Sequence, residues 1–146
     1  MRSSTTEMTV LVTPEMSNFG GYMHGGELLK LLDQVAYTCA MRYCGSYVVT
    51  LSVDNAIFKQ PVRIGELLHF NAAVNYTGRT SMEVGIQVIA EDLQKQVVRH
   101  TNSCYFTMVA IDGLGKPAPV KALSPQTESE KRRWQAAEKR RQQRQS

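Results

Sequence analysis

Two glycine pairs and one aspartate stand out as residues whose types and spacing could do chemistry. Gly20-Gly21 and Gly25-Gly26 come just before residues 27–42, a stretch that lacks Gly and Pro and carries Asp33. If this stretch is a helix, its first backbone N–H groups point into open space, where the helix dipole favours negative charge. Such a helix start can hold a carbonyl oxygen that becomes an oxyanion, and a carboxylate can act as general base or nucleophile. The pattern predicts an active helix with Gly25, Gly26 and Asp33 as catalytic residues.

Helix formers and helical spacing support this prediction. Leu, Ala, Met, Lys and Glu dominate residues 27–43, and one apolar face is formed by Leu28, Leu31, Leu32, Val35 and Cys39. Asp33 lies off this face, on the same stripe as Lys30. A solvent-facing ion pair with Lys30 is therefore the alternative to catalysis. Gly25 and Gly26 have an alternative too, because glycines also let a helix pack closely on a neighbour.

After residue 45 the periodicity changes from helical to alternating. Strands are predicted over residues 9–13, 47–60, 66–77, 81–92 and 97–112. The fourth of these alternates most clearly, with Met82, Val84, Ile86, Val88 and Ala90 on one face. The breaks between the later strands are short, which favours antiparallel pairing. One helix covering a long antiparallel sheet is an α+β arrangement.

Composition and charge limit the class of protein. The chain has 146 residues with 42% hydrophobic residues, and we expect one compact domain over residues 1–123. Residues 124–146 form a basic tail, predicted to be a solvated and partly frayed helix, which carries the whole net charge of +4. No run reaches the roughly 18 apolar residues of a membrane span, and no secretory signal is visible. A cytoplasmic location is expected.

Cysteine and histidine usage argues against a metal site. The three cysteines and three histidines show no zinc-binding spacing, and an odd cysteine count does not suggest a disulfide framework. Cys39 and Cys104 lie in apolar stretches, where a free thiol behaves as a small hydrophobe. We expect no metal and no cofactor.

Several sequence blocks together resemble one known family. The blocks are HGG followed by LLKLLD (residues 24–33), VTLSVDNAIFKQPVRIGELL (49–68), NYTGRTSMEV (75–84) and RHTNSCYFTMVAID (99–112). In this order they resemble the acyl-CoA thioesterases of the hotdog superfamily, specifically the cytosolic acyl-CoA hydrolase branch. The resemblance implies a hotdog fold, in which a long antiparallel sheet wraps around one central helix. It also implies hydrolysis of acyl-CoA to a free acid and CoA.

The resemblance implies roles for individual residues. The catalytic aspartate of the family corresponds to Asp33, and its oxyanion-binding amides correspond to Gly25-Gly26. Many relatives place Asn or Asp at the position of Tyr22, where it helps to orient water or the thioester across a dimer interface. Tyr22 keeps only a hydroxyl, and Asn18 lies nearby as a possible replacement. Whether Asp33 acts as base or nucleophile stays open, and acyl chain length is not readable from the sequence.

CoA carries phosphates, so basic and hydroxyl side chains are candidate binding residues. For each of them a solvated surface role is the alternative, and His24 is also a candidate for helix capping. These candidates are His24, Lys59, Arg79, Thr80, Ser81, Arg99 and His100.

Partners follow partly from the sheet and partly from the resemblance. A sheet with an open edge commonly pairs with a second copy, and the family assembles as dimers that group into hexamers, or trimers of dimers. A catalytically weak acyl-CoA-binding or regulatory protein is the alternative function, motivated by Tyr22. The basic tail with Trp134 raises a third hypothesis, a nucleic-acid binder, although no nucleic-acid module accompanies it.

Overall fold

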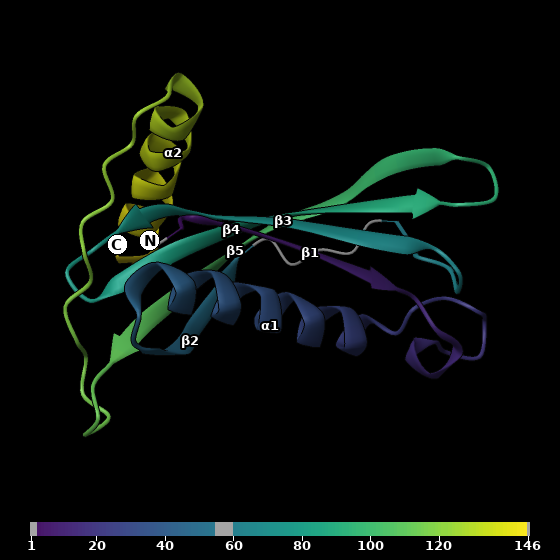
Figure 1. Ribbon diagram of the computed structural model, residues 1–146, viewed down its shortest axis with the longest axis horizontal. Coiled ribbons are helices and arrows are strands. Elements are labelled where there is room, and N and C mark those ends of the chain that lie inside the picture. Colours follow the sequence, from purple (N-terminus) through teal and green to yellow (C-terminus); the bar gives the residue numbers. More distant parts are fainter. Residues whose placement is uncertain (1–2, 55–59, 146) are drawn as a thin grey trace.

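A five-stranded antiparallel sheet holds the molecule together, with one helix on each face (Figure 1). The computed structural model describes residues 3–54 and 60–145. The strand order is β1-β3-β4-β5-β2, so β1 and β2 form the two edges. This is the hotdog arrangement that the sequence resemblance implied. The elements in chain order are β1 (Thr5–Leu11), the 3-10 helix η1 (Pro14–Met16), α1 (Gly25–Cys44), β2 (Tyr47–Asp54), β3 (Leu67–Thr77), β4 (Ser81–Asp92), β5 (Val97–Ile111) and α2 (Glu128–Gln145).

Helix α1 begins and ends at recognisable signals. The imidazole Nδ1 of His24 accepts a hydrogen bond from the N–H of Gly26 at 3.1 Å, which caps the N-terminus. At the other end Gly45 has φ of 73°, a left-handed conformation that suits glycine and ends the helix. Between these ends α1 lays its apolar face on the sheet, and the buried residues of that face are Leu28, Leu32, Val35, Ala36, Cys39 and Ala40.

The sheet presents an apolar inner face to α1. On β4 the predicted alternation is confirmed, because Met82, Val84, Ile86, Val88 and Ala90 are all buried. The inner side of β5 is equally closed, with Cys104, Phe106, Met108 and Ala110. Burial raises the pKa of the Cys39 thiol to about 11 and that of Cys104 to about 12, so both stay protonated at neutral pH. In the described residues all three cysteines are free thiols.

Two strand predictions need correction. The first strand runs over Thr5–Leu11 and not over residues 9–13, because residues 5–11 pair with β3 and the chain then turns into η1 at Pro14. Thr6 is buried in this strand, and its hydroxyl accepts a hydrogen bond from Arg42 on α1 at 3.1 Å. The second strand is described only as far as Asp54. The third begins at Leu67, since Glu66 belongs to the preceding turn.

The tail forms α2, and it is docked on the sheet rather than solvated on all sides. The guanidinium of Arg140 forms two hydrogen bonds to the carboxylate of Glu83, at 2.9 and 2.7 Å, and lies 3.6 Å from the ring centre of Tyr105. Trp134 contacts the ring of Tyr76, with the ring centres 4.9 Å apart. Glu83 is 3% exposed, so α2 covers a charge that the sheet buries.

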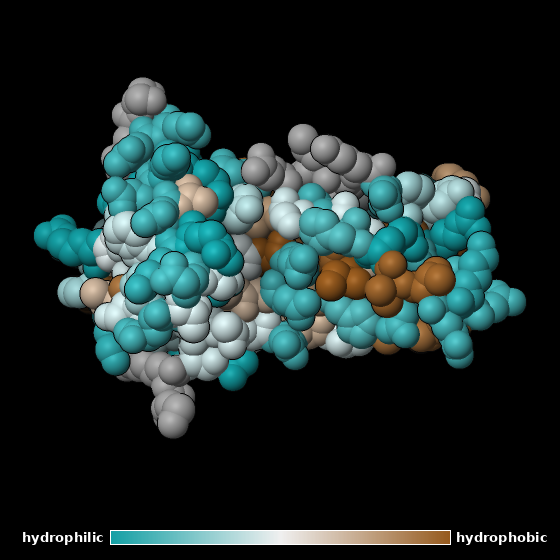
Figure 2. Space-filling view, turned by 90° about the horizontal axis from the view of Figure 1, so that it is seen from above, coloured by the Kyte–Doolittle hydropathy of each residue, from teal (hydrophilic) through white to brown (hydrophobic). Residues whose placement is uncertain are grey.

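The face that carries α2 is divided into two halves (Figure 2). The surface of α2 is hydrophilic, whereas apolar surface gathers on the opposite half of the same face. By strand register the exposed Leu11 and Val98 lie on this outer face, at the end of the sheet away from α2. Neither described helix combines the length and the apolar character that crossing a membrane requires.

Candidate functional site

The carboxylate of Asp33 is held by a hydroxyl from the neighbouring strand. Thr50 on β2 donates its Oγ1–H to Oδ1 of Asp33 at 2.6 Å, and the same hydroxyl lies 3.5 Å from Sδ of Met108. Within one protomer Asp33 is exposed, and no ion pair links it to Lys30 among the described residues. One carboxylate oxygen of Asp33, Oδ1, is therefore oriented by Thr50.

Two apolar side chains on α1 near this carboxylate, and two on the neighbouring strand, are exposed. Leu29 and Tyr37 stand one helical turn before and after Asp33, with 40% and 36% of their surface exposed. On β2, Val49 and Leu51 flank Thr50 in sequence and are 47% and 70% exposed. Since β2 is an edge strand, its outer backbone groups are also open. A carboxylate within an exposed apolar surface beside an open strand edge is typical of an interface site.

The N-terminus of α1 lies some distance from Asp33 in the same protomer. Gly25 and Asp33 are eight positions apart on α1, which corresponds to about 12 Å along a helix. The N–H of Gly26 is bound by the His24 ring, and a Cβ at Gly26 would lie 3.3 Å from His24 Nδ1. His24 thus acts as the helix cap, and Gly26 leaves room for its ring. Gly25 at the first helical position precedes the first intrahelical bond.

The loop before α1 is folded around Asn18. Its Oδ1 accepts hydrogen bonds from the N–H groups of Gly20 and Tyr22, at 3.0 and 3.2 Å. Tyr22 pairs with Arg63 through a backbone bridge, and the Arg63 guanidinium lies 5.6 Å from the Tyr22 ring centre. Asn18 and Tyr22 therefore belong to one compact loop at the N-terminus of α1.

The candidate CoA-binding residues are spread over the molecule. Arg79 and Thr80 lie in the β3–β4 turn, and Ser81 begins β4. The carbonyl of Thr80 accepts from Ala110 N–H at 2.9 Å. His100 lies at the other end of β4 and β5, and its ring bonds to the hydroxyl of Ser103 at 2.9 Å. Lys59 lies outside the described residues. Within one protomer the structure does not bring these residues together, so a shared CoA site stays a prediction.

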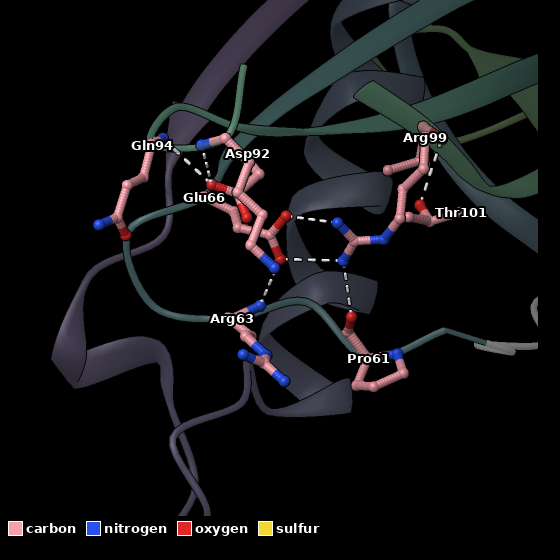
Figure 3. A network of polar contacts seen from close by, with 9 residues as sticks. Pro61, Arg63, Glu66, Asp92, Gln94, Arg99 and Thr101 are labelled. Atoms are coloured by element: carbon pink, nitrogen blue, oxygen red, sulfur yellow. Dashed lines mark hydrogen bonds and ion pairs between the residues drawn. The ribbon is translucent and has the colours of Figure 1, made fainter. Parts of the chain in front are cut away.

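Arg99 has partners that its sequence context did not reveal (Figure 3). Its guanidinium makes a two-pronged contact with the carboxylate of Glu66, and Nη2 also donates to the carbonyl of Pro61 at 2.8 Å. The backbone N–H of Arg63 donates to the same carboxylate at 2.9 Å. Hydrogen bonds from Arg99 lower the pKa of Glu66, against burial, which raises it. Glu66 is thus a buried, ionised carboxylate beside the loop that precedes α1.

Sequence reasoning overlooked Thr50 and Glu66. A threonine in an edge strand carries no mark of function, and only its position opposite Asp33 singles it out. Glu66 falls within the predicted strand over residues 66–77, where a charged side chain is expected to face solvent. In the described residues no group of three or more His, Cys, Asp or Glu could hold a metal ion.

These features define a hotdog protein with a carboxylate site on its central helix, and comparison with known proteins identifies the family. The model of the thioesterase superfamily matches residues 20–97. The chain belongs to the thioesterase superfamily, which confirms the resemblance found in the sequence. The match covers the glycine pairs, Asp33, Thr50 and Glu66.

Two curated relatives illustrate this similarity. The protein VdlD of Helicobacter pylori is 54% identical over 137 residues, covering 94% of this chain and 78% of the relative. The cytosolic acyl coenzyme A thioester hydrolase of Rattus norvegicus is 35% identical over 134 residues. That match covers 90% of this chain but 35% of the rat protein.

Solved structures agree with the fold in detail. A hexameric acyl-CoA thioesterase solved in its apo form has a TM-score of 0.89 and 40% identity, over 97% of this chain and 91% of its own. An acyl-CoA hydrolase from Staphylococcus aureus, solved with butyryl coenzyme A, coenzyme A and coenzyme A disulfide, has a TM-score of 0.86 and 33% identity. It is matched over 97% of this chain and 87% of its own. Three alanine variants of that enzyme, at an Asp, an Asn and a Thr, have also been solved.

Proposed function

We propose that this protein hydrolyses acyl-CoA thioesters to a carboxylic acid and CoA, with Asp33 as the catalytic carboxylate. The observation that carries the proposal is the 2.6 Å hydrogen bond from Thr50 to Asp33, within an exposed apolar surface on the central helix. Membership of the thioesterase superfamily supports the reaction class. The Staphylococcus aureus hydrolase, solved with an acyl-CoA, supports the substrate class.

Residue spacing supports the choice of Asp33, Thr50 and Asn18. In the Staphylococcus aureus hydrolase, the Asn chosen for alanine substitution precedes the Asp by 15 positions, and the Thr follows it by 17. In this chain Asn18 precedes Asp33 by the same interval, and Thr50 follows it by the same interval. We therefore assign the orienting amide to Asn18, and Tyr22 supports its loop.

The chemistry needs a base, an oriented carbonyl and a leaving thiolate. Asp33 takes a proton from water as the water oxygen attacks the thioester carbon, and the carbonyl oxygen becomes an oxyanion. The C–S bond then breaks, and the proton passes to the departing sulfur, so that acid and CoA are released. Direct attack by Asp33 would instead form a mixed anhydride, which water hydrolyses. Thr50 fixes one oxygen of Asp33, so the other meets the substrate or water in a defined orientation.

Two protomers are needed to complete this site. The attacking water must lie about 3 Å from the base and next to the reacting carbon, and the thioester oxygen must lie about 3 Å from the amide donor. Gly25 and Asp33 of one protomer, about 12 Å apart along α1, cannot both satisfy this for one carbonyl. We assign the oxyanion-binding N–H to Gly25 of one protomer and the carboxylate to the second. His24 holds the N–H of Gly26 and thereby shapes this helix start.

The second copy also explains the exposed apolar surface. Pairing through the open edge of β2 would bring a second copy against the exposed Leu51 on β2 and against the exposed Leu29 and Tyr37 on α1. A trimer of such dimers is the proposed full assembly, since the hexameric acyl-CoA thioesterase superposes over 97% of this chain. Replacing Leu51 with Asp should give a smaller species in size-exclusion chromatography with light scattering, together with a loss of turnover.

The remaining assignments follow from the reaction. Hydrolysis through a carboxylate and backbone amides uses no redox chemistry, so we propose a cofactor-free enzyme in which coenzyme A is part of the substrate. The phosphates of CoA would bind basic residues gathered from several protomers, with the exposed Arg79 as one candidate. Lys59, outside the described residues, is a second candidate. A cytoplasmic location remains a prediction. The nucleic-acid hypothesis loses its main support, because three arginines of α2 bond to side chains of the sheet. These arginines are Arg140, Arg141 and Arg144, and their partners are Glu83, Tyr76 and Asp54.

The direct test is release of CoA from a panel of acyl-CoAs, followed with a thiol reagent. Cys39 and Cys104 are buried and have raised pKa values, so the protein's own thiols add little background. We expect turnover with wild type and about a 10-fold lower kcat with Thr50→Val, which removes the hydrogen bond to Asp33 but keeps the size. Thr38→Val is the matched control, since the Thr38 hydroxyl donates to the carbonyl of Gln34 within α1 and has no other partner among the described residues.

Two results would contradict this function. Wild type that binds acyl-CoA tightly without releasing CoA would be a binding or regulatory protein. Equal kcat values for the Thr50→Val and Thr38→Val variants would show that Thr50 has no role in the site. Deleting residues 124–146 tests the tail separately, because a nucleic-acid binder would lose a strongly salt-dependent affinity.

A further inference from the structure

The turn over residues 61–66 comes just before β3 and is hydrogen-bonded both to Arg99 on β5 and to the loop before α1. On one side the turn is held by Arg99, which contacts the Glu66 carboxylate with two nitrogens and the Pro61 carbonyl with one of them. Glu66 is 5% exposed, and its carboxylate also accepts the backbone N–H of Arg63 at 2.9 Å. One buried carboxylate therefore fixes the turn from within, and Arg99 anchors that carboxylate to the sheet (Figure 3).

On its other side the turn is bonded to the loop before α1. The N–H of Met23 donates to the carbonyl of Val62 at 2.7 Å, and the N–H of Ile64 donates to the carbonyl of Gly21 at 3.2 Å. Between these two bonds Tyr22 pairs with Arg63. The loop segment over residues 21–23 thus lies along the turn like a short extra strand.

The loop leads directly to the helix start. The N–H of His24 donates to the carbonyl of Met16 at 2.7 Å, and the His24 ring accepts from Gly26 at 3.1 Å. An unbroken series of contacts therefore runs from Arg99 through Glu66, the turn and residues 21–23 to His24 and Gly25. Each step is a hydrogen bond or a covalent neighbour, so a shift of the turn moves the helix start.

We propose that the Arg99–Glu66 pair is a positioning element that fixes the N-terminus of α1 for binding the thioester oxygen. This inference rests on the proposed hydrolase function. Arg99 does not touch substrate in this account; it acts through Glu66 and the turn. A displacement of about 1 Å at a catalytic group can lower a rate by two orders of magnitude, so a distant pair can control turnover.

A second ion pair in the same sheet provides a matched control. Arg140 binds Glu83 with two hydrogen bonds, and Glu83 is buried like Glu66. That pair joins α2 to the outer face of the sheet, and among the described residues neither side chain bonds to the turn or to the loop before α1. Both pairs should support stability, but only the Arg99–Glu66 pair should affect the rate of the chemical step.

The test compares Arg99→Met with Arg140→Met on two substrates, an acyl-CoA and the corresponding acyl-pantetheine, which lacks the nucleotide. We expect Arg99→Met to lower kcat about 10- to 100-fold on both substrates, with KM changed less than about 3-fold. Arg140→Met should keep kcat within about 2-fold. Arg99→Lys, which can restore one of the contacts, should recover part of the loss.

The double variant Glu66→Gln with Arg99→Met covers the case in which the single variant does not fold, because it leaves no unpaired buried charge. It should show the same loss of kcat. A higher KM for acyl-CoA alone, with kcat unchanged, would make Arg99 a phosphate-binding residue and overturn the proposal. Unchanged kcat and KM in a folded variant would overturn it too.

A structural measurement separates this inference from the hydrolase function. Hydrogen exchange of the amides over residues 16–28 should become faster in Arg99→Met, or in the double variant, and stay unchanged in Arg140→Met. If wild type hydrolyses no thioester, the proposed function fails, while this measurement still decides whether the pair holds the helix start. Unchanged exchange in the Arg99 variants would overturn the positioning role.

Discussion

The two helices, α1 and α2, lie on opposite faces of one sheet, and different kinds of interaction hold each of them there. Helix α1 contacts the inner face through apolar side chains such as Leu32 and Val35, which are fully buried. Helix α2 contacts the outer face through arginines, above all Arg140 with its buried partner Glu83. Asp33, the proposed catalytic carboxylate, lies on α1. The difference suggests that the inner face provides the site and much of the stability, whereas the outer face attaches a charged helix.

The largest expected effect is on the inner face. Leu32→Ala removes a fully buried side chain from the contact between α1 and the sheet, which should lower the free energy of unfolding by about 3 to 5 kcal/mol. Urea unfolding followed by circular dichroism measures this. Leu29→Ala on the exposed side of α1 is the control in a dilute, monomeric sample. A loss below about 1 kcal/mol for Leu32→Ala would contradict an apolar anchor.

A somewhat smaller effect is expected on the outer face. Arg140→Met leaves the buried Glu83 carboxylate without its main partner, so the free energy of unfolding should fall by about 3 kcal/mol. Glu83→Leu combined with Arg140→Met removes both charges and should regain most of that loss. Calorimetry or urea unfolding of wild type and the two variants tests this. A double variant as unstable as the single would show that α2 is held by contacts other than the ion pair.

The smallest expected effect concerns pH and the pair near α1. Glu66 has a pKa lowered below its ordinary value of 4.5, chiefly by hydrogen bonds from Arg99. Its contribution to stability is therefore complete above about pH 4.5 and is lost as the pH falls through the lower pKa of the folded state. Glu66→Gln should show a flatter decline of melting temperature between pH 5 and pH 3, measured by thermal scans. Parallel declines in wild type and variant would contradict the assignment.

Most of the inner face could be predicted from sequence, because its elements are marked by local patterns. The spacing of Leu28, Leu32 and Val35 indicated α1, and strict alternation in β4 indicated which residues are buried. The early start of β1 was missed because Thr6 looks like a surface residue. Its burial depends on the hydrogen bond from Arg42, 36 positions away.

The outer face and part of the site could not be predicted for the same physical reason. Arg140 and Glu83 are 57 positions apart, and a basic tail looks solvated until its buried acceptor is known. Thr50 and Asp33 are 17 positions apart on different elements, so their contact is not encoded in any local pattern. The sequence predicted the start of α1 and proposed Asp33 as the catalytic carboxylate, but it did not indicate that the Thr50 hydroxyl bonds to Asp33.

Whether Asp33 performs the hydrolysis is tested most directly by the kcat of Asp33→Ala with an acyl-CoA that wild type turns over. We expect kcat to fall at least about 100-fold while the melting temperature stays unchanged, because the exposed Asp33 side chain contributes little to the core of its protomer. Lys30→Ala, one helical turn away, should retain wild-type turnover. An Asp33→Ala variant that releases CoA at a rate close to that of wild type would contradict the account.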